Sequence, residues 1–200
     1  MPLTNLPAFD GALLTDDATR KEFSIDLCRN VERVPLAVLK PKSVSDVMKA
    51  LRYANETGLK VSVRGQGHSR WGQTLAADGI LIDSSTLNAV AISDAGVAEA
   101  QTGAYWADVV TPALQRGLVP PTLGTCLKLS VGGILNVGGY SNSSHLHGGI
   151  VDQVLELEVV TGDGRLIECS PRRNAELFDM TLGGCGNIAM MTREIGRAHV

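Results

Sequence analysis

The sequence is poor in aromatic residues, carries no excess of positive charge and contains no long apolar run. Aromatic side chains make up 4% of its 200 residues, and the formal net charge is −3. A nucleic-acid surface needs basic patches and stacking aromatics, so we expect neither nucleic acid nor an anionic membrane as a partner. No run is long enough to cross a bilayer, and Met1–Asp10 lacks the features of a signal peptide. We therefore expect a soluble, cytoplasmic protein.

The cysteines are few and scattered, and they form no C-x-x-C pair: Cys28, Cys126, Cys169 and Cys185. This spacing does not suit a zinc site, and we expect no bound metal. In a cytoplasmic protein the thiols stay reduced. We interpret each cysteine as a small buried hydrophobic residue.

The N-terminal part of the chain has the pattern of a β-α-β unit. A strand is predicted at 36–39, an amphipathic helix between Val44 and Gly58, and a second strand at 59–63. Ser43 and Asp46 have the spacing of a capping box at the start of the helix. A further strand is predicted at 79–83.

The part after Asn88 is richer in hairpins. The hairpins are predicted to pair 90–92 with 97–100 and 154–161 with 165–169. Helical periodicity follows Tyr105 and stops at Gly117, with Pro112 inside it, which predicts a kink or a late start. Asn174 is placed to cap a short helix through Leu182. Both parts of the chain thus mix helices with strands.

The loop after the second strand reads Arg64-Gly65-Gln66-Gly67-His68-Ser69. Its glycines allow the backbone to approach a ligand closely and to aim N–H groups at a pyrophosphate. The loop is not the dinucleotide fingerprint G-x-G-x-x-G, because the third glycine is missing. Taken alone, the loop is equally well explained as a glycine-rich turn with a structural histidine.

Two further glycine-rich segments occur in the C-terminal part. Residues 129–142 contain two Gly-Gly pairs, which we expect to exclude an ordinary helix or strand interior. Residues 183–187 form a third cluster. Three such loops in a chain of this size predict an extended, flat ligand rather than a small anion.

The motifs, in this order, resemble the PCMH-type flavin-binding domain of FAD-linked oxidases of the vanillyl-alcohol-oxidase type, and within it the cytokinin dehydrogenases. The resemblance extends from about Asp10 to Arg193. It is carried by Arg64–Ser69 with Gln73, and by the segments 129–139, 154–164, 174–179 and 183–184. It implies an α+β fold of two lobes with FAD between them.

The resemblance also implies how the cofactor is held. His68 matches the histidine that bonds covalently to the dimethylbenzene edge of the flavin. The other positions that match cofactor contacts are Val63, Gly65, Gln66, Gly67, Ser69, Gln73, Thr125, Ser130, Asn136, Tyr140 and Met191. The implied reaction moves a hydride from an alcohol or amine carbon of a small molecule to flavin N5, and then electrons to oxygen or another acceptor.

Two residues depart from the family pattern. Cytokinin dehydrogenases carry a carboxylate base at the position of Thr125, and a threonine hydroxyl cannot act as a base near neutral pH. We therefore assign no catalytic residue. Cys126 stands six residues before Gly132, where doubly attached flavoproteins of this superfamily have a second flavin bond, although Leu127 replaces the usual proline. A second bond and a free thiol both remain open.

The expected organisation is an arm over 1–30, a first FAD-binding lobe over 31–88 and a second over 89–193. Residues 194–200 match one reading frame of a sequencing-adaptor oligonucleotide. They predict a C-terminally truncated chain without its substrate domain, and no role for His199. The alternatives are an FAD-binding module with no turnover of its own, and a non-covalent flavoprotein like UDP-N-acetylenolpyruvoylglucosamine reductase, against which the presence of His68 argues.

Overall fold

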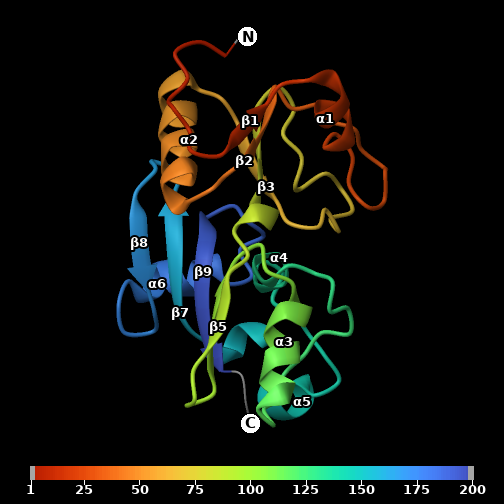
Figure 1. Cartoon of the computed structure of the whole chain (residues 1–200), viewed down its shortest axis with the longest axis vertical. Coiled ribbons are helices and arrows are strands. Elements are labelled where there is room, and N and C mark those ends of the chain that lie inside the picture. Colours follow the sequence, from red (N-terminus) through yellow and green to blue (C-terminus); the bar gives the residue numbers. More distant parts are fainter. Residues whose placement is uncertain (1–2, 198–200) are drawn as a thin grey trace. The chain divides into compact units, whose positions relative to one another are not determined.

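The computed structural model describes residues 3–197 and has an α+β fold. The chain divides into two compact units, each with a sheet and helices of its own (Figure 1). Unit 1 comprises the chain up to Thr86 together with Val160–Leu166. Unit 2 comprises Leu87–Val159 and the chain from Ile167 onward. Among the helices of residues 3–197, none is both long and apolar enough to cross a bilayer.

Unit 1 is built on a four-stranded sheet with the order β1-β2-β4-β3. The strands are β1 (Ala12–Leu14), β2 (Ala37–Lys40), β3 (Val61–Arg64) and β4 (Ile80–Asp83). β4 lies between β2 and β3 and runs parallel to both, whereas β1 is antiparallel to β2. Strands of parallel sheets are buried on both faces, which explains the continuous apolar runs in β2 and β4.

The helices of unit 1 are α1 (Asp17–Glu22), α2 (Val44–Thr57) and the 3-10 turn η1 (Ser84–Thr86). α2 ends at Gly58, which has a left-handed φ of 70°, as the sequence predicts. The capping-box expectation was wrong, because the Ser43 hydroxyl makes no capping bond. The buried Asp46 carboxylate accepts hydrogen bonds from the backbone N–H groups of Asp10 (2.8 Å), Gly11 (2.9 Å) and Lys42 (2.9 Å) instead. It therefore ties the N-terminal arm to the start of α2.

Unit 2 is built on a five-stranded sheet with the order β5-β6-β9-β7-β8. The strands are β5 (Val90–Ile92), β6 (Val97–Gln101), β7 (Val154–Thr161), β8 (Leu166–Cys169) and β9 (Ala189–Arg197). β6 pairs antiparallel with β5, as the predicted hairpin requires, and antiparallel with the central strand β9. The last part of β9 therefore belongs to the middle of the sheet.

The helices of unit 2 are α3 (Trp106–Gln115), α4 (Val131–Leu135), α5 (Ser144–His147), α6 (Ala175–Thr181) and the 3-10 turn η2 (Ile150–Gln153). Of the two alternatives expected at Pro112, a kink or a late start, the late start is ruled out, since α3 begins at Trp106 and contains Pro112. Its start is fixed by the Asp108 carboxylate, which accepts a hydrogen bond of 2.9 Å from Tyr105 N–H. Residues from α3, α4, α6 and the sheet form the core of this unit, with Leu157 and Val159 fully buried.

Candidate functional site

The predicted attachment loop follows β3 directly in unit 1. Gly67 is buried and has a left-handed φ of +66°, and a Cβ atom there would lie 2.5 Å from a guanidinium nitrogen of Arg64. Only glycine fits this position without displacing that side chain. The next residue, His68, is exposed. The loop therefore turns tightly against Arg64 and presents the imidazole at the surface of unit 1.

Residues 25–33, which we call the arm segment, hold this loop from both sides of His68. Leu27 N–H donates a hydrogen bond of 2.8 Å to the Gly67 carbonyl. The carboxylate oxygen Oδ2 of Asp26 accepts from Gly72 N–H (2.8 Å) and from Ser69 Oγ (3.1 Å). Burial tends to raise the pKa of the Asp26 carboxyl, but these bonds, with the backbone N–H groups of Arg29 and Cys28, outweigh it and lower the pKa below its ordinary value.

The other predicted residues of unit 1 lie around the same loop. Val63 is half-buried in β3, and Gly65 and Gln66 connect that strand to Gly67. Gln73 is exposed, and its side-chain oxygen accepts a hydrogen bond of 2.9 Å from Trp71 N–H. The fold thus brings these positions together on one segment, with Gln73 bracing the turn that follows His68.

In unit 2 the first Gly-Gly pair lies inside α4, which corrects the expectation that these glycines exclude a helix. A Cβ atom at Gly132 would overlap Thr102 Oγ1, so glycine serves close packing here rather than an irregular backbone. Gly132 N–H donates 2.9 Å to the Thr102 carbonyl, and Val131 N–H donates 2.8 Å to that of Ala104. These bonds hold the first turn of α4 against the end of β6.

The third glycine cluster packs on the end of α4. Gly183 N–H and Cys185 N–H donate hydrogen bonds of 2.8 Å to the carbonyls of Leu135 and Asn136. The Asn136 side-chain nitrogen donates a hydrogen bond of 2.8 Å to the Gly132 carbonyl, and the side-chain oxygen Oδ1 is buried with no hydrogen-bond partner in the described part of the chain. A buried acceptor without a donor costs free energy, and a ligand N–H is one group that would satisfy it. Asn136 therefore fits a role in holding a cofactor.

The remaining predicted contacts of unit 2 differ in exposure. Tyr140 is 82% exposed, an unusual position for a large ring that nothing in this unit covers. Ser130 is buried at the start of α4, and Thr125 is exposed. Met191 is 2% exposed and packs in the core of the unit. Their roles toward FAD stay predictions.

The cysteines are not uniformly buried as expected. Cys28, Cys126 and Cys185 are exposed because they lie in the arm segment, in the loop before α4 and in the glycine cluster. Cys169 alone is buried, at the end of β8, and burial raises its pKa to about 11. No group of metal-binding side chains occurs within residues 3–197. His199 lies outside the described residues.

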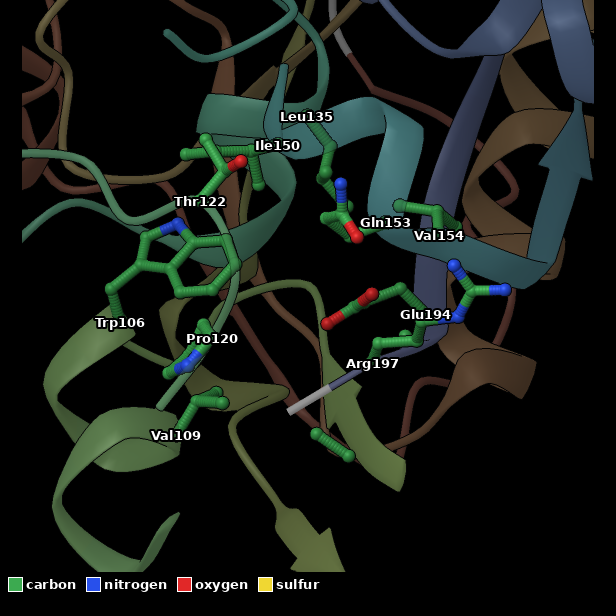
Figure 2. Close-up of a pocket in the computed structure, with 12 residues that line it drawn as sticks. Trp106, Val109, Pro120, Thr122, Leu135, Ile150, Gln153, Val154, Glu194 and Arg197 are labelled. Atoms are coloured by element: carbon green, nitrogen blue, oxygen red, sulfur yellow. The ribbon is translucent and has the colours of Figure 1, made fainter. Parts of the chain in front are cut away.

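A small cavity inside unit 2 is lined by Trp106, Gln153 and Glu194, among others (Figure 2). Its volume of about 20 Å³ is enough for one water molecule and far too small for a flavin or a substrate. Burial raises the pKa of the Glu194 carboxyl to about 8, and the indole N–H of Trp106 is buried without a partner. The cavity is a polar defect in the core rather than a binding site.

Sequence reasoning missed Asp26 and Thr102. Asp26 sits between Ile25 and Leu27 with no motif around it, and its donors on the attachment loop, Ser69 Oγ and Gly72 N–H, lie more than 40 residues away in sequence. Thr102, whose carbonyl accepts from Gly132 N–H, is also distant from Gly132 in the sequence. Neither contact leaves a local signal, so only the folded structure reveals them.

The family model described as the FAD binding domain matches residues 35–170. This covers more than half of the chain, and the chain therefore belongs to that family of FAD-binding domains of flavin-dependent oxidoreductases. The cofactor expected from the sequence, FAD, is confirmed at this level.

The chain is similar in sequence to curated proteins that are named as oxidoreductases or dehydrogenases. It is 40% identical over 177 residues to an uncharacterised oxidoreductase of the fasciation locus of Rhodococcoides fascians, covering 88% of this chain and 40% of that protein. It is 36% identical over 202 residues to cytokinin dehydrogenase 1 of Oryza sativa subsp. japonica, covering 96% and 38%. The chain thus spans about two fifths of the length of these relatives.

Solved structures show the same fold. The 6-hydroxy-D-nicotine oxidase of Arthrobacter nicotinovorans matches with a TM-score of 0.88 and 29% identity, over 98% of this chain and 44% of that one. The glucooligosaccharide oxidase of Acremonium strictum, described with a 6-S-cysteinyl, 8α-N1-histidyl FAD, matches with a TM-score of 0.86 and 25% identity, over 95% and 41%. The expected PCMH-type α+β fold is confirmed.

Proposed function

We propose that this chain binds FAD covalently through His68 and is the cofactor-binding part of an enzyme that oxidises an alcohol or amine carbon of a small molecule. The observation that carries the proposal is the exposed His68, held on a loop whose neighbours on both sides are hydrogen-bonded to the arm segment. The glucooligosaccharide oxidase with a histidyl FAD supports it. The family membership supplies the cofactor.

Each unit contributes residues suited to parts of FAD. The glycines before His68 allow the backbone to approach a ligand closely, which suits a pyrophosphate. In unit 2, the orphaned Asn136 Oδ1 and the exposed Tyr140 ring suit a flat heterocycle with N–H donors. When bound, FAD supplies a two-electron acceptor at N5. The protein residues bind and orient it.

The chain offers no general base for substrate oxidation at the expected position. Thr125 is exposed and its hydroxyl does not accept a proton near neutral pH. The relatives are named for a cytokinin, a nicotine derivative and an oligosaccharide. The proposal therefore extends to the class of reaction, with oxygen or another molecule as the electron acceptor.

The covalent bond is tested by producing the chain with FAD, denaturing it in acid and measuring flavin fluorescence of the protein band on a denaturing gel. We expect the band of the wild type to fluoresce and the band of His68→Ala to be dark. His145→Ala, which removes another exposed histidine, is the matched control and should keep the signal. A dark wild-type band, or a His68→Ala band as bright as the wild type, would contradict the proposal.

A second flavin bond through Cys126 is favoured by one observation, the exposure of this thiol outside the core. The structure described for the glucooligosaccharide oxidase carries both cysteinyl and histidyl bonds. If both form here, His68→Ala retains part of the gel fluorescence and only His68→Ala/Cys126→Ala loses all of it. Adding Cys126→Ala therefore separates a second bond from a wrong assignment of His68.

A further inference from the structure

We propose that Asp26 is a positioning residue for covalent flavin attachment, because its carboxylate fixes the backbone that carries His68. This inference rests on the proposed function, since it concerns how fast the His68 bond forms. Asp26 lies in the arm segment, outside the glycine loop. It acts on His68 through Ser69 and Gly72 and does not itself contact the ring in the described contacts.

The geometry places both Asp26 bonds on the C-terminal side of His68. One oxygen, Oδ2, accepts from Ser69 Oγ at 3.1 Å and from Gly72 N–H at 2.8 Å. Ser69 Oγ also bonds Thr74 Oγ1 at 2.9 Å. Gly72 has a φ of +73°. Asp26 therefore closes the turn that follows His68 into a hydrogen-bonded ring.

The N-terminal side of His68 is fixed by the neighbours of Asp26. Leu27 N–H donates 2.8 Å to the Gly67 carbonyl, and Arg64 Nη1 donates 2.6 Å to the Ile25 carbonyl. The Arg64 guanidinium in turn packs against Gly67. His68 is consequently an exposed residue whose neighbours on both sides are hydrogen-bonded, and residues 25–27 take part in the bonds on each side.

The Asp26 carboxylate is buried beside the loop that it holds. Asp26 is 3% exposed, and its second carboxylate oxygen, Oδ1, is buried with no hydrogen-bond partner among residues 3–197. A buried carboxylate oxygen without a donor is costly. The charge of Asp26 also favours the charged form of the half-buried Arg64 guanidinium nearby. What an apolar residue cannot do is accept from Ser69 and Gly72 at once.

The step that depends on this positioning joins a ring nitrogen of His68 to the methyl carbon of the dimethylbenzene edge. The methyl group gives up a proton, the imidazole gives up its N–H proton, and the two electrons of the broken C–H bond are taken up by the flavin, which is thereby reduced. Molecular oxygen then reoxidises it and is reduced to hydrogen peroxide. The reaction needs a neutral nitrogen held in line with that carbon, so its rate responds to small displacements.

The test measures the rate at which added FAD becomes covalent in the 200-residue chain prepared without flavin. The covalent fraction is read by gel fluorescence over time, and FAD binding is titrated separately by quenching of flavin fluorescence. We expect Asp26→Ala to slow covalent attachment at saturating FAD by about tenfold or more, since misplacement of a reacting group has effects of that order. Asp26→Asn keeps an acceptor for both donors and should restore the rate to within about twofold of the wild type.

Asp46→Ala is the matched control. Asp46 is also a fully buried carboxylate of unit 1, and it accepts from the backbone N–H groups of Asp10 and Gly11 in the N-terminal arm and of Lys42 before α2. None of its described hydrogen bonds involves the His68 loop. It should lower stability to thermal unfolding and leave the attachment rate unchanged. A loss of rate that merely followed stability would appear in both variants.

Ser69→Ala removes the donor of one of the two Asp26 bonds, and it replaces Asp26→Ala in the test if Asp26→Ala does not fold. It should slow attachment by several-fold, and Asp26→Asn/Ser69→Ala should be no slower than Ser69→Ala, because asparagine keeps the acceptor for Gly72 N–H. An unchanged rate in Asp26→Ala, or in Ser69→Ala where the former does not fold, overturns the role of Asp26. A wild type that never forms covalent FAD overturns the proposed function instead.

Discussion

Glu194 should make the stability of unit 2 fall as pH rises, and replacing it by glutamine should remove this dependence. The residue is 5% exposed in the central strand β9, and burial alone raises its pKa from 4.5 to about 8. Arg197 is the other charged residue of the cavity lining, and it forms no ion pair with Glu194 within residues 3–197. The folded state therefore keeps the carboxyl protonated and neutral near pH 7.

The sign and size follow from this difference in pKa. Below the ordinary pKa the folded and unfolded chains both hold the proton, and the free energy of unfolding has its full value. Between about pH 4.5 and 8 the unfolded chain releases the proton while the folded chain keeps it, so the free energy of unfolding falls by about 1.4 kcal/mol per pH unit. The total loss is roughly 5 kcal/mol, comparable to the whole stability of many domains.

The assay is urea unfolding between pH 5 and pH 9, followed by the fluorescence of Trp106, which is buried in the same unit. Trp71→Phe as the common background removes the second tryptophan. The difference in unfolding free energy between Glu194→Gln and its parent should grow steadily from pH 5 to pH 8 and then stay constant. Glu176→Gln, at an exposed site of unit 2, is the control. A difference that does not vary with pH would refute the reasoning.

Two further predictions concern packing and thiol reactivity. Gly132→Ala should lower the free energy of unfolding by about 1–3 kcal/mol in a urea titration, because the new methyl group overlaps Thr102 Oγ1. The control Gly162→Ala, whose methyl group meets open space, should be nearly neutral. In the flavin-free chain, Ellman's reagent should react quickly with the three exposed cysteines and with Cys169 only on unfolding, since its thiol is buried with a pKa of about 11. Four equally fast thiols would show that Cys169 is accessible.

Local patterns in the sequence predicted the regular elements well. α2 appeared with its Gly58 end, and the two hairpins of unit 2 formed where alternation and turn residues place them. These features depend on neighbours within a few residues, so a single sequence contains the information. β1 and α1 were not predicted, because elements of three and six residues carry too little periodicity.

Features set by distant contacts were beyond local reasoning. The insertion of β4 between β2 and β3 depends on pairing across the whole of unit 1. Val160–Leu166 belongs to unit 1 although the residues on either side belong to unit 2. The helix through Gly132 forms because Thr102, on another segment, leaves no room for a side chain. For the site, the motif located the loop of His68, but nothing near Asp26 indicated what holds that loop.

Asp26 and Glu194 show why burial of a carboxylate does not by itself indicate a function. Both are almost completely buried, yet the pKa of Asp26 is lowered and that of Glu194 is raised. The difference lies in the donors: Gly72 N–H and Ser69 Oγ point at Asp26, whereas Glu194 receives no hydrogen bond within the described residues. Asp26 thus stays charged and holds Ser69 and Gly72, which follow His68, through hydrogen bonds. Glu194 remains neutral, and this lowers the free energy of unfolding as pH rises. Of the two, only the carboxylate with donors on the attachment loop can influence the chemistry of His68.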